Sequence, residues 1–135
     1  MANELDVAGF PVTLAFQVAN VAANATTNLT FGQGGTGWVV PAGYKANAVF
    51  LSAGVNADLT AGVGTFNVTA NGTALANGPT VVLGDTTQRS SDVERPGTQP
   101  IAAGQIVGVN IVADVNLAPQ TTDADAILSL LLTPA

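Results

Sequence analysis

The stretch Thr65-Phe66-Asn67-Val68-Thr69-Ala70-Asn71-Gly72-Thr73-Ala74-Leu75 carries the strongest structural signal in this chain. Asn71-Gly72 favours a two-residue hairpin turn, because both residues tolerate the positive φ angles that a type I′ turn requires. Before the turn, Phe66 and Val68 alternate with polar residues, and after it Leu75 continues the apolar set. A period of two is typical of a half-buried strand. The stretch therefore predicts an antiparallel hairpin, and it leads us to expect further short strands and tight turns around it.

Alternation of apolar and polar residues recurs on both sides of this hairpin. It predicts further strands in the stretches 11–19, 28–31, 38–40, 46–53, 80–83, 106–113 and 126–133. The Ala-, Asn- and Thr-rich residues 20–27 are expected to turn. No window keeps a helical period, and turn signals recur at the spacing expected of an all-β sandwich. The sequence predicts an N-terminal arm over residues 1–10 and a single antiparallel β-sandwich domain of about eight strands over residues 11–135.

The composition argues against several classes of function. The chain of 135 residues contains no cysteine and no histidine, which removes thiolate chemistry, the commonest general base and the commonest metal ligand. Its net charge is −6, so the phosphate backbone of a nucleic acid is repelled and no nucleic-acid partner is expected. No apolar run approaches the ~20 residues that span a bilayer, and no export signal is visible at the N-terminus. We expect a soluble protein without a membrane partner.

Candidate sites for catalysis or metal binding are few. Asp123 and Asp125 form a D-x-D pair with Asp114 nearby, a pattern compatible with a calcium loop but more typical of an acidic surface loop. Residues 32–37 match G-x-G-x-x-G, but a β-branched run and a proline follow where a dinucleotide site needs a helix, which indicates a loop. The serines have no histidine to activate them. The sequence predicts no enzyme activity, no cofactor and no resident metal ion.

The N-terminal arm is the first candidate for a contact with another protein. Residues 1–10 lack a clear period. They are compatible with a frayed terminus, which is the usual state of a chain end that nothing ties down. They are equally compatible with an arm that orders on a partner, with Leu5, Val7 and Phe10 as its apolar anchors.

Residues 84–100 are the second candidate contact segment. They hold Arg89 and Arg95, two of the three cations in the chain. One interpretation is a solvated strand and loop with ion pairs that contribute under about 1 kcal/mol each. The other is an interface centred on the two arginines, because arginine is enriched where proteins meet.

From Trp38 onward the order of segments resembles the small jelly-roll domains of bacteriophage structural proteins. That group comprises capsid decoration (cement) proteins, head fibres and tail-fibre tips. The segments that carry the resemblance are the turn Val40-Pro41-Ala42-Gly43-Tyr44, the hairpin quoted above, the polar Gln88-Arg89-Ser90-Ser91, the stretch Pro100–Val109 and the Leu-rich last strand. The resemblance implies a jelly-roll-like sandwich that assembles as a homotrimer.

The same resemblance implies a function. A chain that is nearly all one domain is most similar to a decoration or cement protein, which binds the outer capsid surface and stabilises the shell. The implied partners are further copies of the chain and the major capsid protein, and the implied location is the capsid surface of a virion assembled in the host cytoplasm. The alternative is a receptor- or carbohydrate-binding tip domain of a phage fibre. A sugar site usually displays an aromatic platform, for which only Trp38 and Tyr44 are candidates.

Overall fold

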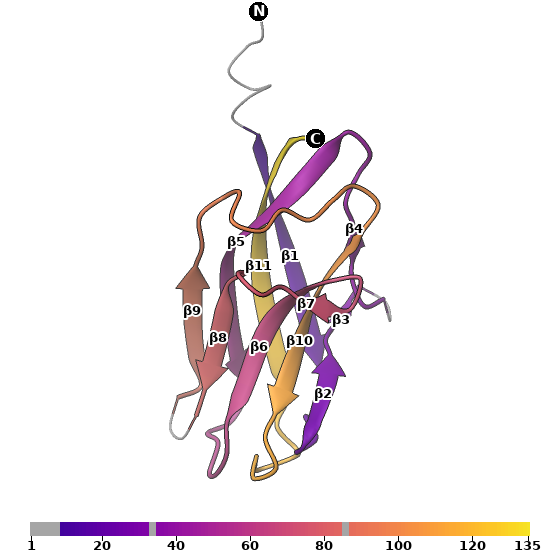
Figure 1. Cartoon of the computed structure of the whole chain (residues 1–135). Coiled ribbons are helices and arrows are strands. Elements are labelled where there is room, and N and C mark those ends of the chain that lie inside the picture. The colour runs from indigo at the N-terminus through magenta and orange to yellow at the C-terminus, as the bar shows by residue number, and fades with distance from the viewer. Residues whose placement is uncertain (1–8, 33–34, 85–86) are drawn as a thin grey trace, which may run out of the picture.

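Two antiparallel β-sheets packed face to face make up the fold (Figure 1). The computed structural model describes residues 9–32, 35–84 and 87–135. In chain order the strands are β1 (Phe10–Val18), β2 (Ala25–Asn28), β3 (Thr30–Phe31), β4 (Trp38–Val39), β5 (Tyr44–Val55), β6 (Gly64–Ala70), β7 (Thr73–Ala74), β8 (Thr80–Leu83), β9 (Arg89–Val93), β10 (Ile106–Ala113) and β11 (Ala124–Pro134). Among these described residues, no helix is long and apolar enough to cross a membrane.

The strands pair in a nested order. Sheet A has five strands, in the spatial order β3-β1-β11-β5-β9. Sheet B has six strands. Four of them lie in the spatial order β2-β10-β6-β7, and in addition β4 pairs with β10 and β8 pairs with β6. The outermost pair is β1 with β11, followed by β2 with β10, β5 with β9 and β6 with β8. The chain is thus one long double ribbon wrapped across both sheets, which is the topology of a jelly roll.

The predicted all-β sandwich is confirmed. Its eight nested strands each have four or more residues. The remaining strands β3, β4 and β7 have two residues each. The core lies between the sheets and is filled by alternate residues, as the pleat requires. On β10 the side chains of Val107, Val109 and Ile111 are buried, and on β11 Leu128 and Leu130 are fully buried.

The predicted hairpin forms, although its second strand is short. Asn71 and Gly72 have φ angles of 50° and 84°, the left-handed conformations that a type I′ turn requires. Phe66 and Val68 face the core. After Ala74 the chain leaves the sheet, and β8 takes the place of β7 along the same edge of β6.

The expectation of a turn over residues 20–27 is wrong in part. Residues Ala25–Asn28 form strand β2 and pair with β10. The strand carries no large apolar side chain, so its pairing depends on β10 rather than on a hydrophobic pattern of its own. Leu29 is fully buried, and after it the chain crosses to sheet A as β3. The stretch 28–31 is therefore divided between two sheets.

Strand β5 changes its inward face halfway along. Ala46 and Ala48 are buried, and beyond them Leu51 and Ala53 are buried, so strict alternation does not hold. The reason is a register shift opposite Ser129 and Leu130, where one extra residue enters β5. Such a bulge reverses which side chains point into the core. The apolar residues on both faces of this strand are explained by the bulge.

Candidate docking surfaces

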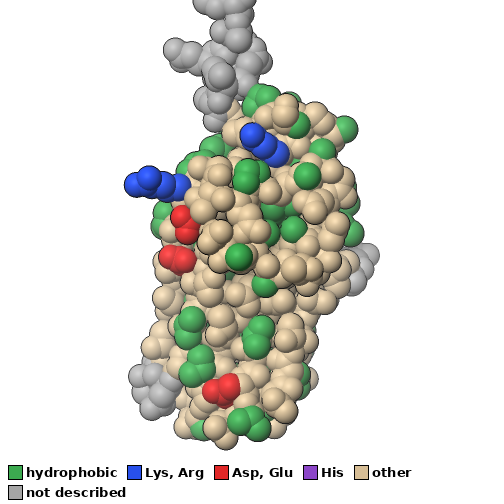
Figure 2. Space-filling view, in the orientation of Figure 1, with side chains coloured by type: hydrophobic (Ala, Val, Ile, Leu, Met, Phe, Trp, Pro, Cys, Tyr) green, Lys and Arg blue, Asp and Glu red, His purple; other side chains and the backbone are tan. Residues whose placement is uncertain are grey.

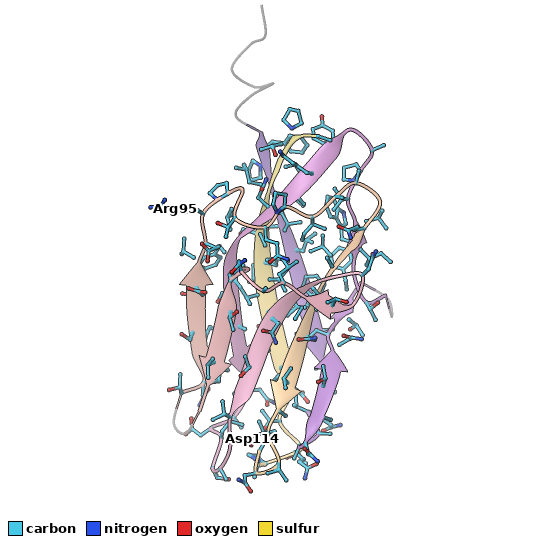
Figure 3. The ribbon with its side chains drawn as sticks, in the orientation of Figure 1. Arg95 and Asp114 are labelled. Atoms are coloured by element: carbon cyan, nitrogen blue, oxygen red, sulfur yellow. The ribbon has the colours of Figure 1, made fainter. Side chains whose placement is uncertain are left out.

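Charge on the described surface lies toward the margins of the sandwich. Figure 2 views the outer face of sheet B, and its acidic and basic side chains lie near the edges while the middle is uncharged. Arg95 and Asp114 lie toward opposite ends of the molecule (Figure 3). Broad uncharged faces and charged margins favour contacts made by shape and apolar area over contacts steered by charge.

The start of β1 is held firmly by its neighbours. Gly9 has a φ of 73°, and a Cβ at this position would overlap the carbonyl oxygen of Leu132. Phe10 is 43% exposed, and its ring stands edge-on against Tyr44 with the centroids 5.3 Å apart. The chain therefore enters the sandwich at a fixed point beside the C-terminal strand. Leu5 and Val7 lie outside the described residues.

Arg89 reaches across a neighbouring strand to an aspartate. Its Nη2 lies 2.7 Å from Oδ1 and 2.6 Å from Oδ2 of Asp125 on β11. The guanidinium crosses β5 over Gly54, where an added Cβ would lie 2.8 Å from Arg89 Cζ. Both side chains are about half exposed (47% and 48%), so the pair contributes no more than about 1 kcal/mol to stability.

Arg95 does not join Arg89. It follows the end of β9, and its side chain projects away from the sandwich (Figure 3). Arg89 instead begins β9 and is turned inward toward β11. Between them Val93 is 72% exposed, the highest value among the large hydrophobic side chains of the described residues. The two arginines thus bracket an apolar edge strand rather than forming one basic patch.

The outer face of sheet A is uncharged over most of its area. Two rows of uncharged residues run across it, each with one residue from β1, β11, β5 and β9 in turn. The first row is Ala15, Ile127, Ser52 and Ser91, and the second is Thr13, Ser129, Phe50 and Val93. Ile127 is 41% exposed, although it lies in the strand at the centre of the sheet. The apolar second face of the last strand, visible in the sequence, is the signal that indicates this surface.

The acidic residues at the far end of the sandwich fasten loops together. Asp114 accepts hydrogen bonds from the backbone N–H of Val63 at 3.1 Å and of Asn116 at 3.0 Å. Asp123 accepts one from the backbone N–H of Asn20 at 3.2 Å. Within the described ranges, no group of three or more acidic side chains is placed to share a metal ion. These carboxylates hold the loops between β1 and β2, β5 and β6, and β10 and β11.

One buried hydroxyl at this end lacks a partner. Thr122 is 2% exposed, and its Oγ1 makes no hydrogen bond to any described residue. We expect Thr122→Val to raise the free energy of unfolding by about 1 kcal/mol, because valine keeps the shape and removes the desolvated hydroxyl. Urea denaturation measures the change, with Thr121→Val at the exposed neighbouring position as the control. A loss of stability in Thr122→Val would contradict this account.

One depression lies at the margin of sheet A. It has a volume of about 470 Å³ and is lined in part by Gln17, Thr30, Asn56 and Asp123. Its polar groups already serve the fold: the Thr30 hydroxyl donates to the Gln17 carbonyl at 2.8 Å, and Asn56 Oδ1 accepts from the Asp123 N–H at 2.8 Å. The depression therefore offers few free polar groups to a ligand.

The two aromatic residues proposed as a sugar platform are both partly buried. Trp38 packs against the hydrophobic core from strand β4. Tyr44 is engaged with Phe10 and also packs against the core. Both rings are therefore partly engaged in the packing of the sandwich, which weakens the case for an aromatic sugar platform.

Comparisons with known proteins support the architecture. No family model matches the chain, and no curated protein matches it. A chain from the capsid asymmetric unit of cyanophage Pam1 is 15% identical with a TM-score of 0.57, over 99% of this chain and 92% of that one. A chain from the acidic stable capsid structure of Helicobacter pylori bacteriophage KHP30 is 12% identical with a TM-score of 0.53. The match covers 93% of this chain and 90% of that one. At these identities the likeness shows a shared fold.

Proposed function

We propose that the chain is a bacteriophage capsid decoration (cement) protein that binds the outer capsid surface and stabilises the shell. The observation that carries the proposal is the nested jelly roll, which is shared over nearly the whole chain with chains from two phage capsid structures. The low charge content of 9% and the uncharged outer face of sheet A support a mechanical role based on buried area. Its location is the capsid surface of the virion, and it carries out no enzymatic step.

The N-terminal arm is the proposed tether to the major capsid protein. Gly9 and Phe10, where the arm joins the sandwich, are held in place by contacts with Leu132 and Tyr44. Leu5, Val7 and the exposed part of Phe10 supply its apolar anchors. Fully burying one such side chain stabilises a complex by about 1.5–3 kcal/mol, so two or three anchors suffice for a useful affinity.

The arm gives a direct test of capsid binding. We expect Leu5→Ser/Val7→Ser to weaken co-sedimentation with capsids of the source virus at least about tenfold, because two apolar contacts are lost. The matched control is Ala2→Ser/Ala8→Ser, which makes as many polar changes in the arm and should bind as the parent does. Cryo-electron microscopy of the virion locates the protein. Density at a tail tip instead of the shell would refute the decoration role.

The proposed assembly is a homotrimer in which β9, with Arg89 and Arg95 at its two ends, lies at the interface. β9 is an edge strand of sheet A, and exposed edges readily pair with other chains. Its Val93 is 72% exposed, and arginine beside an apolar centre is common in interfaces.

The trimer predicts a specific effect of charge at β9. Light scattering at micromolar concentration should give the mass of three chains for the parent. It should give the mass of one chain for Val93→Asp, because a buried unpaired carboxylate is strongly unfavourable. Val82→Asp changes an equally apolar side chain, 57% exposed on β8, and should remain trimeric. A monomeric parent protein would contradict the proposal.

A further inference from the structure

The outer face of sheet B holds a groove built from uncharged side chains. It has a volume of about 330 Å³ and is lined by Asn28, Thr36, Thr69, Asn71, Gly72 and Ile106. This volume is at the lower end of the range for small-ligand sites, roughly 300–1,000 Å³. The middle of this face carries no charged side chain (Figure 2). The groove lies between the turn of the central hairpin and the segment that contains Thr36.

Gly108 allows the walls of the groove to approach each other. It lies on β10 directly opposite Thr69 on β6. A Cβ at Gly108 would lie 2.6 Å from the carbonyl oxygen of Thr36 and 2.9 Å from Oγ1 of Thr69. Because Gly108 has no side chain, the carbonyl oxygen of Thr36 and the hydroxyl of Thr69 can both lie close to β10.

Thr69 is the polar group that points to a ligand. The residue is only 4% exposed, yet it lines the groove, and its Oγ1 lies beside the Gly108 backbone, 2.9 Å from where a Cβ would be. A threonine hydroxyl can both donate and accept a hydrogen bond. A molecule bound in the groove would exchange a hydrogen bond with this hydroxyl.

Asn71 offers a second polar group in a fixed position. Its Oδ1 accepts a hydrogen bond from the Ile106 backbone N–H at 2.8 Å, and its own N–H donates to the Ile106 carbonyl at 2.8 Å. The amide is thereby held in place while its Nδ2 hydrogens remain available as donors. A preorganised group of this kind loses little freedom when it binds a ligand.

We propose that this groove binds a neutral glycan. Threonine hydroxyls and asparagine amides both donate and accept hydrogen bonds, as sugar hydroxyls do. Ile106, 42% exposed, supplies an apolar contact for the C–H face of a sugar ring. No lysine or arginine lines the groove, so a phosphate, sulfate or carboxylate group would have no counter-charge there. The site is independent of capsid binding and lies on the sheet opposite β9.

The test uses the full chain and defined oligosaccharides. Maltohexaose, mannopentaose and diacetylchitobiose serve as neutral probes and 3′-sialyllactose as the anionic probe, each titrated to millimolar concentration while backbone amide resonances are followed by NMR. At least one neutral probe should shift the resonances of Thr69, Asn71 and Ile106, and 3′-sialyllactose should not. Thr69→Val should weaken that binding about tenfold, the loss of about one well-placed hydrogen bond.

Matched variants separate the groove from the rest of the face. Thr65→Val lies on the same strand and face outside the groove, and it should change affinity less than about twofold. Should Thr69→Val fail to fold, Asn28→Ala at an exposed lining position takes its place and should weaken binding. Binding of the anionic probe alone, no shift with any neutral probe, or an unchanged affinity in the groove variant would overturn the proposal. Capsid co-sedimentation is measured separately, so either idea can fail without the other.

Discussion

Leu128→Ala is expected to lower the free energy of unfolding by about 3 kcal/mol. Leu128 is fully buried at the centre of β11. It pairs with Leu14 of β1 on one side and with Leu51 of β5 on the other, so a row of leucines crosses three strands. Truncation removes transfer free energy and leaves a cavity that the neighbouring strands cannot fill. Guanidinium denaturation of the full chain measures the change.

The next residue along β11 supplies the control. Ile127 points to the outer face of sheet A and is 41% exposed. Ile127→Ala should therefore lower the free energy of unfolding by less than about 1.5 kcal/mol, which is at most half of the effect expected for Leu128→Ala. Equal losses at the two positions would mean that β11 is paired one residue out of the register described, since a slip of one residue exchanges the two faces.

Gly62→Ala is expected to destabilise the protein by about 3 kcal/mol. Gly62 has a φ of 78°, a conformation that costs an L-residue about 1–2 kcal/mol. An added Cβ would also lie 2.5 Å from Oδ1 of Asp114 and would overlap the backbone nitrogen of Leu117. Asp114 is fixed by its hydrogen bonds to Val63 and Asn116, so the loop has no easy way to yield. Overpacking of this kind adds about 1–3 kcal/mol.

Gly43→Ala separates the cost of the positive φ angle from the cost of the steric overlap. Its φ of 85° is similar, but an added Cβ meets nothing within 4 Å. We expect only the conformational cost of about 1 kcal/mol there. Thermal denaturation of both variants gives the comparison. A similar loss in the two would show that contact with the β10–β11 connection contributes nothing at Gly62.

The fold class was predictable because apolar side chains mark the strands that face the core. β10 and the central hairpin show this directly, through Val109, Phe66 and Val68. β2 could not be predicted, because small and polar residues form it and β10 dictates its pairing. The change of face in β5 was also hidden, since a bulge depends on the register with β11 rather than on the sequence of β5 alone.

The candidate sites were less predictable than the fold. Arg89 stands out in a chain with three cations, but its partner Asp125 lies two strands away and is reachable only because Gly54 lacks a side chain. Thr69 belongs to the hairpin with the strongest sequence signal. Its place in a groove depends on Gly108 and Thr36, which the fold brings beside it. Local patterns report on strands, whereas these sites depend on contacts between segments that are distant in the chain.

The nested pairing of strands sets the order in which the protein can fold. β1 and β11 come from opposite ends of the chain, so sheet A stays incomplete on the ribosome until residues 124–134 have emerged. The turn at Asn71-Gly72 closes a short loop between β6 and β7, and a hairpin of this kind forms within about 1–10 μs. The pairings of β1 with β11, β2 with β10 and β5 with β9 await long loop closures, which places folding in the range of about milliseconds to seconds. During that interval β1 presents an unpaired edge, at which incompletely folded chains can pair with each other.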